Sequence, residues 1–446
     1  MPNGLLRIQL IRFPPRIALL AVLAAAGTVD AVEAAQAAQT GVPLDQALAQ
    51  GNPSLVAAAL QAMPHDATTA AMVRSQLSYD LPTVMASALR CRDLAMAHNS
   101  PAAAASCGKV AYRAALVLGD AKATFAAIAW MKNKGYPAVG RPPLLGNAFD
   151  GVDLEGLARS LPESTTDLAK TGGAMPYENE AFVTGDQGAA ARQTGADIKV
   201  APTVAVTING KPSAALVDTG SAYAVMMDRT HADALDVKTL VTGLPPMPTM
   251  GAPPVGDSLT IGRLDTLVIG PLTLRNLLVL VVPSGNQLTD RVIVGLPVLA
   301  RLRKFEFRKS SLVVNERLPP CREPLPLTYA STWDEDGKVV FDVTADGRVV
   351  KANIDTGLAS LLAAGKPLIP PNDGTHAAAP GRRYLKLSVG SANLSDDSAL
   401  LEPDMSFPAA FIGAPVIATF DVRLDFTDSK FCLSRRAVGG SHDASD

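Results

Sequence analysis

The 446-residue sequence is poor in the residue types that several classes of function require. Aromatic residues make up 5% of it, which argues against a stacking platform for single-stranded nucleic acid. The formal net charge is −2 and no long run of Lys or Arg occurs, so neither nucleic acid nor an anionic membrane surface is favoured as a partner. The five histidines are scattered, and no zinc-protease, phosphate-loop or nucleophilic-serine motif is present. We therefore expect no metal and no cofactor.

Long apolar runs are also missing, apart from one near the N-terminus. Three arginines precede the apolar run 17–26, and Ala35-Gln36-Ala37 follows it as a small-residue cleavage site. This order is typical of a secretory signal peptide, which we assign to residues 1–37. The run is too short to span a bilayer, and an uncleaved anchor is the alternative. The predicted localisation is therefore secreted or periplasmic.

Only four cysteines occur, and none forms a C-x-x-C pair, which argues against a zinc ribbon or a redox pair. An even number of cysteines in an exported chain favours disulfides. Cys91 and Cys107 lie eight residues on either side of Asn99, where a helical hairpin is expected to turn. At a rise of ~1.5 Å per residue both lie about 12 Å from the turn and face each other. This geometry favours a Cys91–Cys107 disulfide and leaves Cys321 to pair with Cys432.

Two stretches precede the β-rich part of the chain. Residues 42–137 are rich in Ala, Leu and Met, and Asn52-Pro53 and Ser100-Pro101 each place a capping residue before a proline at the first helical position. This predicts a helical-hairpin module, similar to helical repeats, that serves either structural packing or the docking of a protein partner. Residues 138–194 lack sustained periodicity and contain Gly and Pro clusters, which predicts a linker with short ordered pieces.

From about residue 195 the pattern changes to β-strands, and one segment occurs twice. Each copy has a hairpin turn, Asn209-Gly210 or Asp346-Gly347, with an Asp nine positions after the turn begins. An apolar residue precedes each Asp, and downstream each copy has an apolar block that ends in Gly-x-Pro. The matched stretches are Asp218-Thr219-Gly220-Ser221 with Gly295-Leu296-Pro297, and Asp355-Thr356-Gly357-Leu358 with Gly413-Ala414-Pro415.

The doubled motif resembles the retropepsin-like aspartic peptidases, and two such lobes in one chain are similar in layout to pepsin. The resemblance implies an α+β multidomain chain, in which the helical module precedes two homologous all-β lobes at residues 195–317 and 325–437. It also implies that one chain holds a complete site, so that the protein is a monomer with pseudo-dimeric lobes. Pairing of each lobe with its copy in a second chain is the alternative.

The resemblance assigns the chemistry to two carboxyl groups. Two carboxylates held close together share one proton, because both do not ionise comfortably. The ionised group then acts as general base on a water molecule, and the protonated group polarises the scissile carbonyl. We therefore expect Asp218 and Asp355 to be the catalytic pair of an aspartic endopeptidase that acts on a peptide or protein substrate.

The residues that follow each Asp are expected to support the pair. Gly220 and Gly357 allow the backbone to approach the carboxylates and donate amide hydrogen bonds. By the family resemblance, Thr219 and Thr356 interlock the two loops beneath the pair, and the Ser221 hydroxyl bonds the carboxylate of its own lobe.

The two copies also differ. Leu358 stands where Ser221 stands in the first copy, and this favours the alternative function of an inactive, peptide-binding pseudo-peptidase with a helical scaffold module. The first copy is longer between its two blocks, and the segment 245–262, rich in Gly, Pro and Met, is a candidate flap over the substrate, with a plain surface loop as the alternative. The second copy offers only a short counterpart at 381–390, so we expect one flap and not two.

Overall fold

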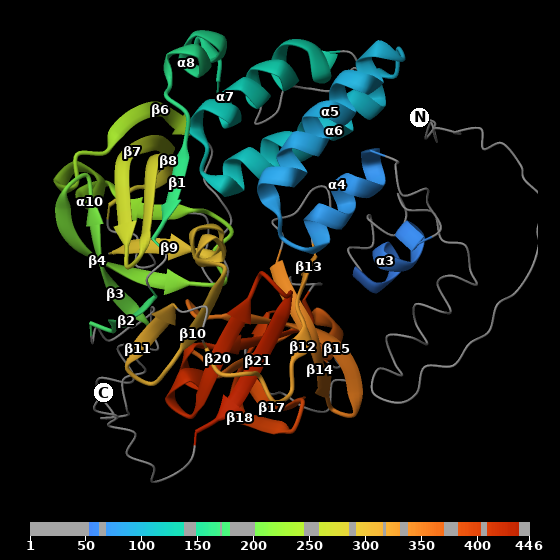
Figure 1. The fold of residues 1–446 in the computed structure, drawn as a ribbon, viewed down its shortest axis with the longest axis vertical. Coiled ribbons are helices and arrows are strands. Elements are labelled where there is room, and N and C mark those ends of the chain that lie inside the picture. Colours follow the sequence, from blue (N-terminus) through green and yellow to red (C-terminus); the bar gives the residue numbers. More distant parts are fainter. Residues whose placement is uncertain are drawn as a thin grey trace, which may run out of the picture.

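The structure is a computed structural model, and it describes residues 53–61, 68–137, 149–169, 172–178, 201–244, 258–284, 291–314, 318–330, 338–369, 382–402 and 408–436. The predicted signal peptide and most of the predicted flap, residues 245–257, lie outside the described residues. The described chain forms N-terminal helices followed by two β-barrel lobes, which confirms the predicted fold class (Figure 1).

The helical module is a series of antiparallel hairpins. The side chain of Asp120 caps α7 by accepting a hydrogen bond of 2.9 Å from the N–H of Ala123. The disulfide Cys91–Cys107 joins α5 to α6, as predicted from the spacing about Asn99. The elements are α3 (Pro53–Gln61), α4 (Thr68–Leu77), α5 (Leu81–Ala97), α6 (Pro101–Leu118), α7 (Ala121–Trp130), the π-helix η1 (Met131–Gly135) and α8 (Leu154–Ser160).

Lobe one is an eight-stranded sheet in which β8 also pairs with β7, so that six of its strands close into a barrel. The barrel order is β8-β5-β9-β4-β3-β7. The elements of lobe one are β1 (Thr165–Leu168), β3 (Thr203–Ile208), β4 (Lys211–Asp218), β5 (Val225–Asp228), α10 (Arg229–Ala234), β6 (Lys238–Leu244), β7 (Leu259–Ile269), β8 (Leu272–Val282), β9 (Val292–Gly295), α11 (Leu296–Leu299) and η3 (Ala300–Leu302).

Lobe two has the same ring of six strands, in the order β18-β16-β19-β15-β14-β17. The stretch 381–390 is mainly the barrel strand β17, the counterpart of β7, because it pairs with both β18 and β14. A flap in lobe one alone stays a prediction, because residues 245–257 and 370–381 lie outside the described residues. The elements of lobe two are β13 (Thr328–Ala330), β14 (Lys338–Ala345), β15 (Arg348–Asp355), β16 (Leu362–Gly365), η4 (Lys366–Leu368), β17 (Arg382–Val389), β18 (Ala392–Glu402), β19 (Ala410–Gly413) and η5 (Ala414–Ala418).

The two hairpin turns have the same conformation. Asn209 and Gly210 have φ of 50° and 79°, and Asp346 and Gly347 have φ of 49° and 78°. Positive φ at both central residues is the type I′ turn that matches the twist of paired strands and that Asn-Gly and Asp-Gly favour. Each turn thus starts the strand that carries the Asp of its lobe.

A third sheet joins the lobes. Its order is β12-β21-β20-β10-β11-β2, and its central pair, β10 with β20, brings together one strand from each lobe. One hydrophobic core runs through this sheet into both barrels, with Phe305, Phe341 and Phe431 fully buried. The elements are β2 (Gly173–Pro176), β10 (Lys304–Phe307), β11 (Ser311–Val314), β12 (Leu325–Pro326), β20 (Phe420–Asp425) and β21 (Lys430–Arg435).

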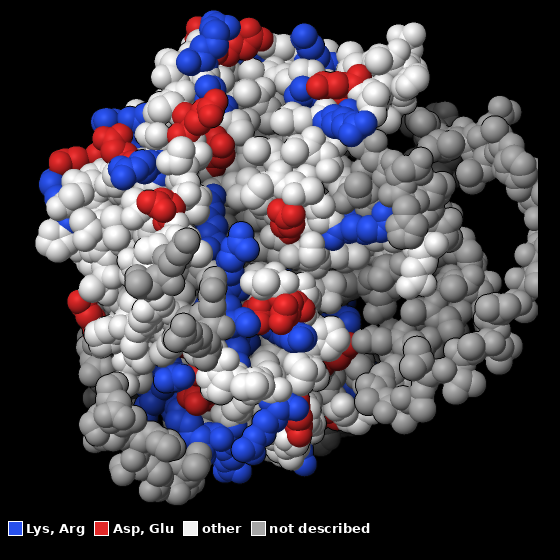
Figure 2. Space-filling view, viewed as in Figure 1, with Lys and Arg blue, Asp and Glu red and all other residues white. Residues whose placement is uncertain are grey.

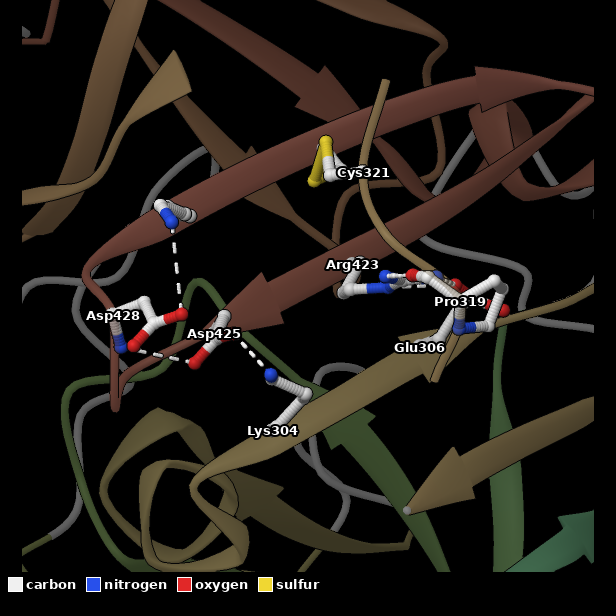
Figure 3. Close-up of a disulfide and its surroundings, with 9 residues drawn as sticks. Lys304, Glu306, Pro319, Cys321, Arg423, Asp425 and Asp428 are labelled. Carbon is white, nitrogen blue, oxygen red and sulfur yellow. Dashed lines mark hydrogen bonds and ion pairs between the residues drawn. A yellow bond between two sulfur atoms is a disulfide. The ribbon is translucent and has the colours of Figure 1, made fainter. Parts of the chain in front are cut away.

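Ion pairs cross the junction between β10 and β20. The carboxylate of Glu306 accepts a hydrogen bond of 2.8 Å from Nε of Arg423, and Lys304 lies 2.6 Å from Asp425 (Figure 3). Arg423 also donates to the carbonyl oxygen of Pro319, in the segment that connects the lobes. In the view of Figure 2, Lys and Arg side chains run down the middle of the face and across its lower part, with acidic side chains beside them.

The second disulfide lies in the same region. Cys321 of the connecting segment is bonded to Cys432 of β21, the second predicted pairing (Figure 3). Cys432 is the register partner of Arg423 on the neighbouring strand, so the covalent bond and the buried ion pair hold the same part of the connection.

The predicted linker contributes more order than its composition suggested. Its described parts form α8, the strand β1 that pairs with β8 of lobe one, and the strand β2 that pairs with β11 of the interlobe sheet. The strands β1 and β2 have four residues each, which is too short for a periodic pattern to identify them in the sequence.

The helical module is bound to lobe one along an extended apolar contact. Phe125 and Phe149 share a core with Ile261, Leu278 and other residues of β6, β7 and β8, and Figure 1 shows α7 and α8 beside these strands. The N–H of Leu278 donates to the carbonyl oxygen of Gly119 at 2.7 Å. In the part of the chain that the structure describes, no helix combines the length and the apolar character needed to cross a bilayer.

We predict that Glu306→Met lowers the free energy of unfolding by about 3–5 kcal/mol, because it leaves the guanidinium of Arg423 buried without its carboxylate. The double variant E306M/R423M is expected to recover part of that loss, since both charges are then absent. Urea denaturation measures both values. Asp428→Asn is the control, because its pair with Lys430 is exposed and should contribute less than about 1 kcal/mol. An E306M variant as stable as D428N would contradict the prediction.

Candidate active site

The two Asp residues of the doubled motif end corresponding strands. Asp218 is the last residue of β4 and Asp355 is the last residue of β15. Each of these strands pairs in parallel with the later strand of its own lobe, which puts Asp218 beside Gly295 and Asp355 beside Gly413. The two blocks that both copies share therefore meet at the point where the Asp side chain leaves its strand.

Only glycine fits at the last position of β9 in lobe one and of β19 in lobe two. A Cβ on Gly295 would overlap the carbonyl oxygen of Tyr223, and a Cβ on Gly413 would overlap that of Ser360. Those carbonyls belong to the loop that follows each Asp-Thr-Gly. The apolar-apolar-Gly block is thus a packing requirement, since the loop passes directly over the glycine.

A buried net of hydrogen bonds joins the two lobes beneath the Asp residues. Thr219 N donates to Thr356 Oγ1 at 3.0 Å, and Thr356 N donates to Thr219 Oγ1 at 3.1 Å. Each hydroxyl in turn donates at 2.6 Å to the other lobe, Thr219 to Ile354 O and Thr356 to Val217 O. Both threonines are buried, so these bonds are shielded from water. The two threonines thus occupy the interlocking positions that the family resemblance implied.

Backbone amides orient the carboxylates. Asp218 Oδ1 accepts from Gly220 N at 2.8 Å and from Ser221 N at 3.1 Å, whereas Asp355 Oδ1 accepts from Gly357 N at 3.0 Å. The Ser221 hydroxyl, expected to bond the carboxylate, instead lies 3.4 Å from the carbonyl oxygen of Tyr223. The backbone N–H of Ser221, and not its hydroxyl, therefore donates the hydrogen bond to the Asp218 carboxylate.

The backbone at Leu358 follows the same turn as at Ser221. Leu358 N donates at 3.1 Å to the main-chain oxygen of Asp355, and Ser221 N lies 3.4 Å from that of Asp218. The Leu side chain removes no hydroxyl that lobe one uses at its carboxylate, but the two carboxylates receive different sets of amide donors.

Each glycine of the motif lies against the carboxyl group of the opposite lobe. A Cβ on Gly357 would lie 2.6 Å from Cγ of Asp218, and a Cβ on Gly220 would overlap the carboxyl group of Asp355. The absence of a side chain at both positions is what lets the two loops close on one another.

The electrostatics follow from this proximity. Burial raises the pKa of Asp218 to about 7, and the negative charge of Asp355 and a hydrogen bond between the two carboxyl groups act in the same direction. Lys338 and the amide of Gly220 lower that pKa in part. A carboxyl pair in this state keeps one proton between its members near neutral pH.

Lys338 also reaches the site, although no motif in the sequence indicates it. It is the first residue of β14 in lobe two, yet its ammonium group donates a hydrogen bond to the carbonyl oxygen of Gly220 in lobe one. The sequence does contain a signal for it. The two Asp residues lie 137 positions apart, and at the same offset Lys338 stands where the first copy has Ala201, so the two copies differ in charge at this position. Among the described residues no group of three or more His, Cys, Asp or Glu side chains is arranged to hold a metal ion.

Comparisons with known proteins support the resemblance. Residues 204–301 match the family described as gag-polyprotein putative aspartyl protease, a segment that runs from β3 to η3 and includes Asp218. Among solved structures, a retropepsin-like aspartic protease from Rickettsia conorii matches at 15% identity, covering 34% of this chain and 96% of that chain. The TM-score of 0.22 is too low for this match to carry an argument. No curated protein matches the chain.

We predict that Thr219→Val lowers the free energy of unfolding by about 1–3 kcal/mol, because the buried N–H of Thr356 then loses its acceptor. Thr219→Ser keeps the hydroxyl and should lower the free energy of unfolding by clearly less. Urea unfolding of the two variants beside the unsubstituted protein makes the comparison. Equal stability of T219V and T219S would show that the hydroxyl contributes nothing.

Proposed function

We propose that this chain, whose lobe one matches the aspartyl protease family model reported above, is an endopeptidase with Asp218 and Asp355 as its catalytic pair. The observation that carries the proposal is the reciprocal bonding of Thr219 and Thr356, because it brings one Asp-Thr-Gly loop from each lobe together in a single chain. Two carboxyl groups in hydrogen-bonding contact, one with a raised pKa, are what hydrolysis through an activated water requires.

In the proposed reaction the pair begins with one proton. The ionised carboxylate accepts a proton from a water molecule as that water attacks the carbonyl carbon of the scissile peptide. The protonated carboxyl donates a hydrogen bond to the carbonyl oxygen, where negative charge develops. Proton transfer to the leaving nitrogen then lets the C–N bond break. Because the two groups titrate as a unit, the proposal fixes no separate role for either Asp.

We further propose export to the periplasm and action as a monomer on a peptide or protein substrate. The disulfides Cys91–Cys107 and Cys321–Cys432 support an oxidising compartment. The pairing of β10 with β20 within the chain supports a site that needs no second copy. The packing of the helical module on lobe one supports a structural role for at least that face of the module.

We predict that Asp218→Asn and Asp355→Asn each abolish cleavage of a diverse peptide library, because an amide neither acts as the base nor shares the proton. The two losses should not add in the double variant, since the residues act as one unit. Mixing the two single variants should restore nothing. Restored activity would support pairing between chains, and full activity of D355N would mean that lobe two is degenerate. Peptide binding without any cleavage by the unsubstituted protein would favour the pseudo-peptidase.

The pH dependence gives a second test. With the pKa of Asp218 at about 7, the pair keeps its shared proton below that pH and loses it above, so both groups are then ionised. We predict that kcat/KM falls as pH rises through about 7. Initial rates in buffers of constant ionic strength measure the profile. A flat profile across this range would contradict the shared proton.

A further inference from the structure

The two lobes are not equivalent at the strand that leads to the site. From residue 201 to residue 224, adding 137 gives the counterpart in lobe two, so Ala201 corresponds to Lys338 and Leu216 corresponds to Asn353. In lobe one Ala201 and Leu216 are buried together in a small apolar cluster. In lobe two the same two positions hold a cation and an amide. The duplication therefore carries a polar pair on one side only.

The cation is directed across the junction between the lobes. Lys338 is half-buried, and its Nζ donates to the carbonyl oxygen of Gly220. The peptide group that contains this oxygen also contains the N–H of Ser221, which donates to Asp218 Oδ1 at 3.1 Å. A chain of two hydrogen bonds thus runs from the ammonium group through one peptide unit to the carboxylate. Such a chain strengthens itself, because each bond polarises the next.

The part of the chain that the structure describes has no such arrangement around Asp355. The carbonyl oxygen of Gly357 has Ala201 as the counterpart of Lys338, and a methyl group donates no such hydrogen bond. The N–H groups of Leu358 and Ser221 both donate to the main-chain oxygen of their own Asp, but among the described residues only that of Ser221 also donates to the carboxylate. Among the described residues, only Asp218 is therefore connected to a cation in this way.

We propose that Lys338 is a positioning residue that holds the Gly220–Ser221 peptide and favours the negative charge on Asp218. The proposal rests on the proposed function, and it adds a residue outside the Asp-Thr-Gly motifs to the site. The charged groups that act on the Asp218 carboxyl are Asp355 of lobe two, which opposes ionisation, and Lys338, which favours it. Asn353 keeps the start of β14 in place, since its amide donates at 2.8 Å to Val339 O.

The direction of the effect follows from the sign of the charge. A cation near two carboxyl groups stabilises their ionised forms, so its removal raises both apparent pKa values of the pair. The whole pH profile of kcat/KM then moves to higher pH. A residue that merely supported the fold would lower activity by the same factor at every pH.

The test compares pH profiles of kcat/KM for K338M and K338R with that of the unsubstituted protein. Lys386→Met is the matched control, because Lys386 is an exposed lysine on β17. We expect both limbs of the K338M profile to move up by about one pH unit, and those of K338R and K386M to stay in place. A K338M profile that superimposes on that of the unsubstituted protein after scaling would overturn the proposal.

A titration without substrate separates this proposal from the proposed function. Carboxyl-¹³C NMR of protein labelled at Asp follows the pair directly, and D218N identifies the Asp218 resonance. A rise of the apparent pKa values in K338M supports the role of Lys338, even if the unsubstituted protein cleaves nothing and the proposed function fails. Unchanged values in K338M, together with cleavage that D218N abolishes, would overturn the role of Lys338 and leave the peptidase in place.

Discussion

The reciprocal hydrogen bonds between Thr219 and Thr356 are the interaction on which the arrangement of the lobes depends. Each threonine is donor and acceptor at once, and each hydroxyl reaches the strand of the opposite lobe. Because a buried polar group without a partner costs about 1–3 kcal/mol, separating the loops would leave several such groups unsatisfied together. The close approach of the glycines to the opposite carboxyl groups, and with it the raised pKa of Asp218, follows from this contact.

The interlobe sheet supports the same geometry from a distance. The pairing of β10 with β20, the buried ion pair Glu306–Arg423 and the disulfide Cys321–Cys432 all act on the short connection between the lobes. A continuous core then extends from this sheet into both barrels. The position of each carboxyl group is thus determined at two places, one directly beneath it and one where the chain passes between the lobes.

Much of this architecture could be predicted from the sequence, and the reasons are local. Asn209-Gly210 and Asp346-Gly347 predict hairpins because few residues tolerate positive φ, and the helical hairpin about Asn99 predicts which cysteines face each other. The match of the two Asp-Thr-Gly segments predicts two lobes of one kind. Contacts between residues that lie far apart in the sequence could not be predicted, because turn and helix patterns describe only neighbouring residues. The donation from Lys338 to Gly220 spans 118 positions, and the pairings of β1 and β2 involve strands of four residues.

The strands β1 and β2 belong to sheets whose other strands come later in the chain, so the boundaries of the structural units do not follow the order of the sequence. They precede both lobes in the sequence, yet β1 completes the edge of the lobe-one sheet and β2 completes the edge of the interlobe sheet. The N–H of Glu178 also donates to the carbonyl oxygen of Thr203 at 2.8 Å. A single cut of the backbone between β2 and β3 would therefore yield two fragments that remain associated, held by strand pairing and by the apolar contact of α7 and α8 with lobe one. The helices α7 and α8 and the strands β1 and β2 are thus structural parts of the lobes that follow them.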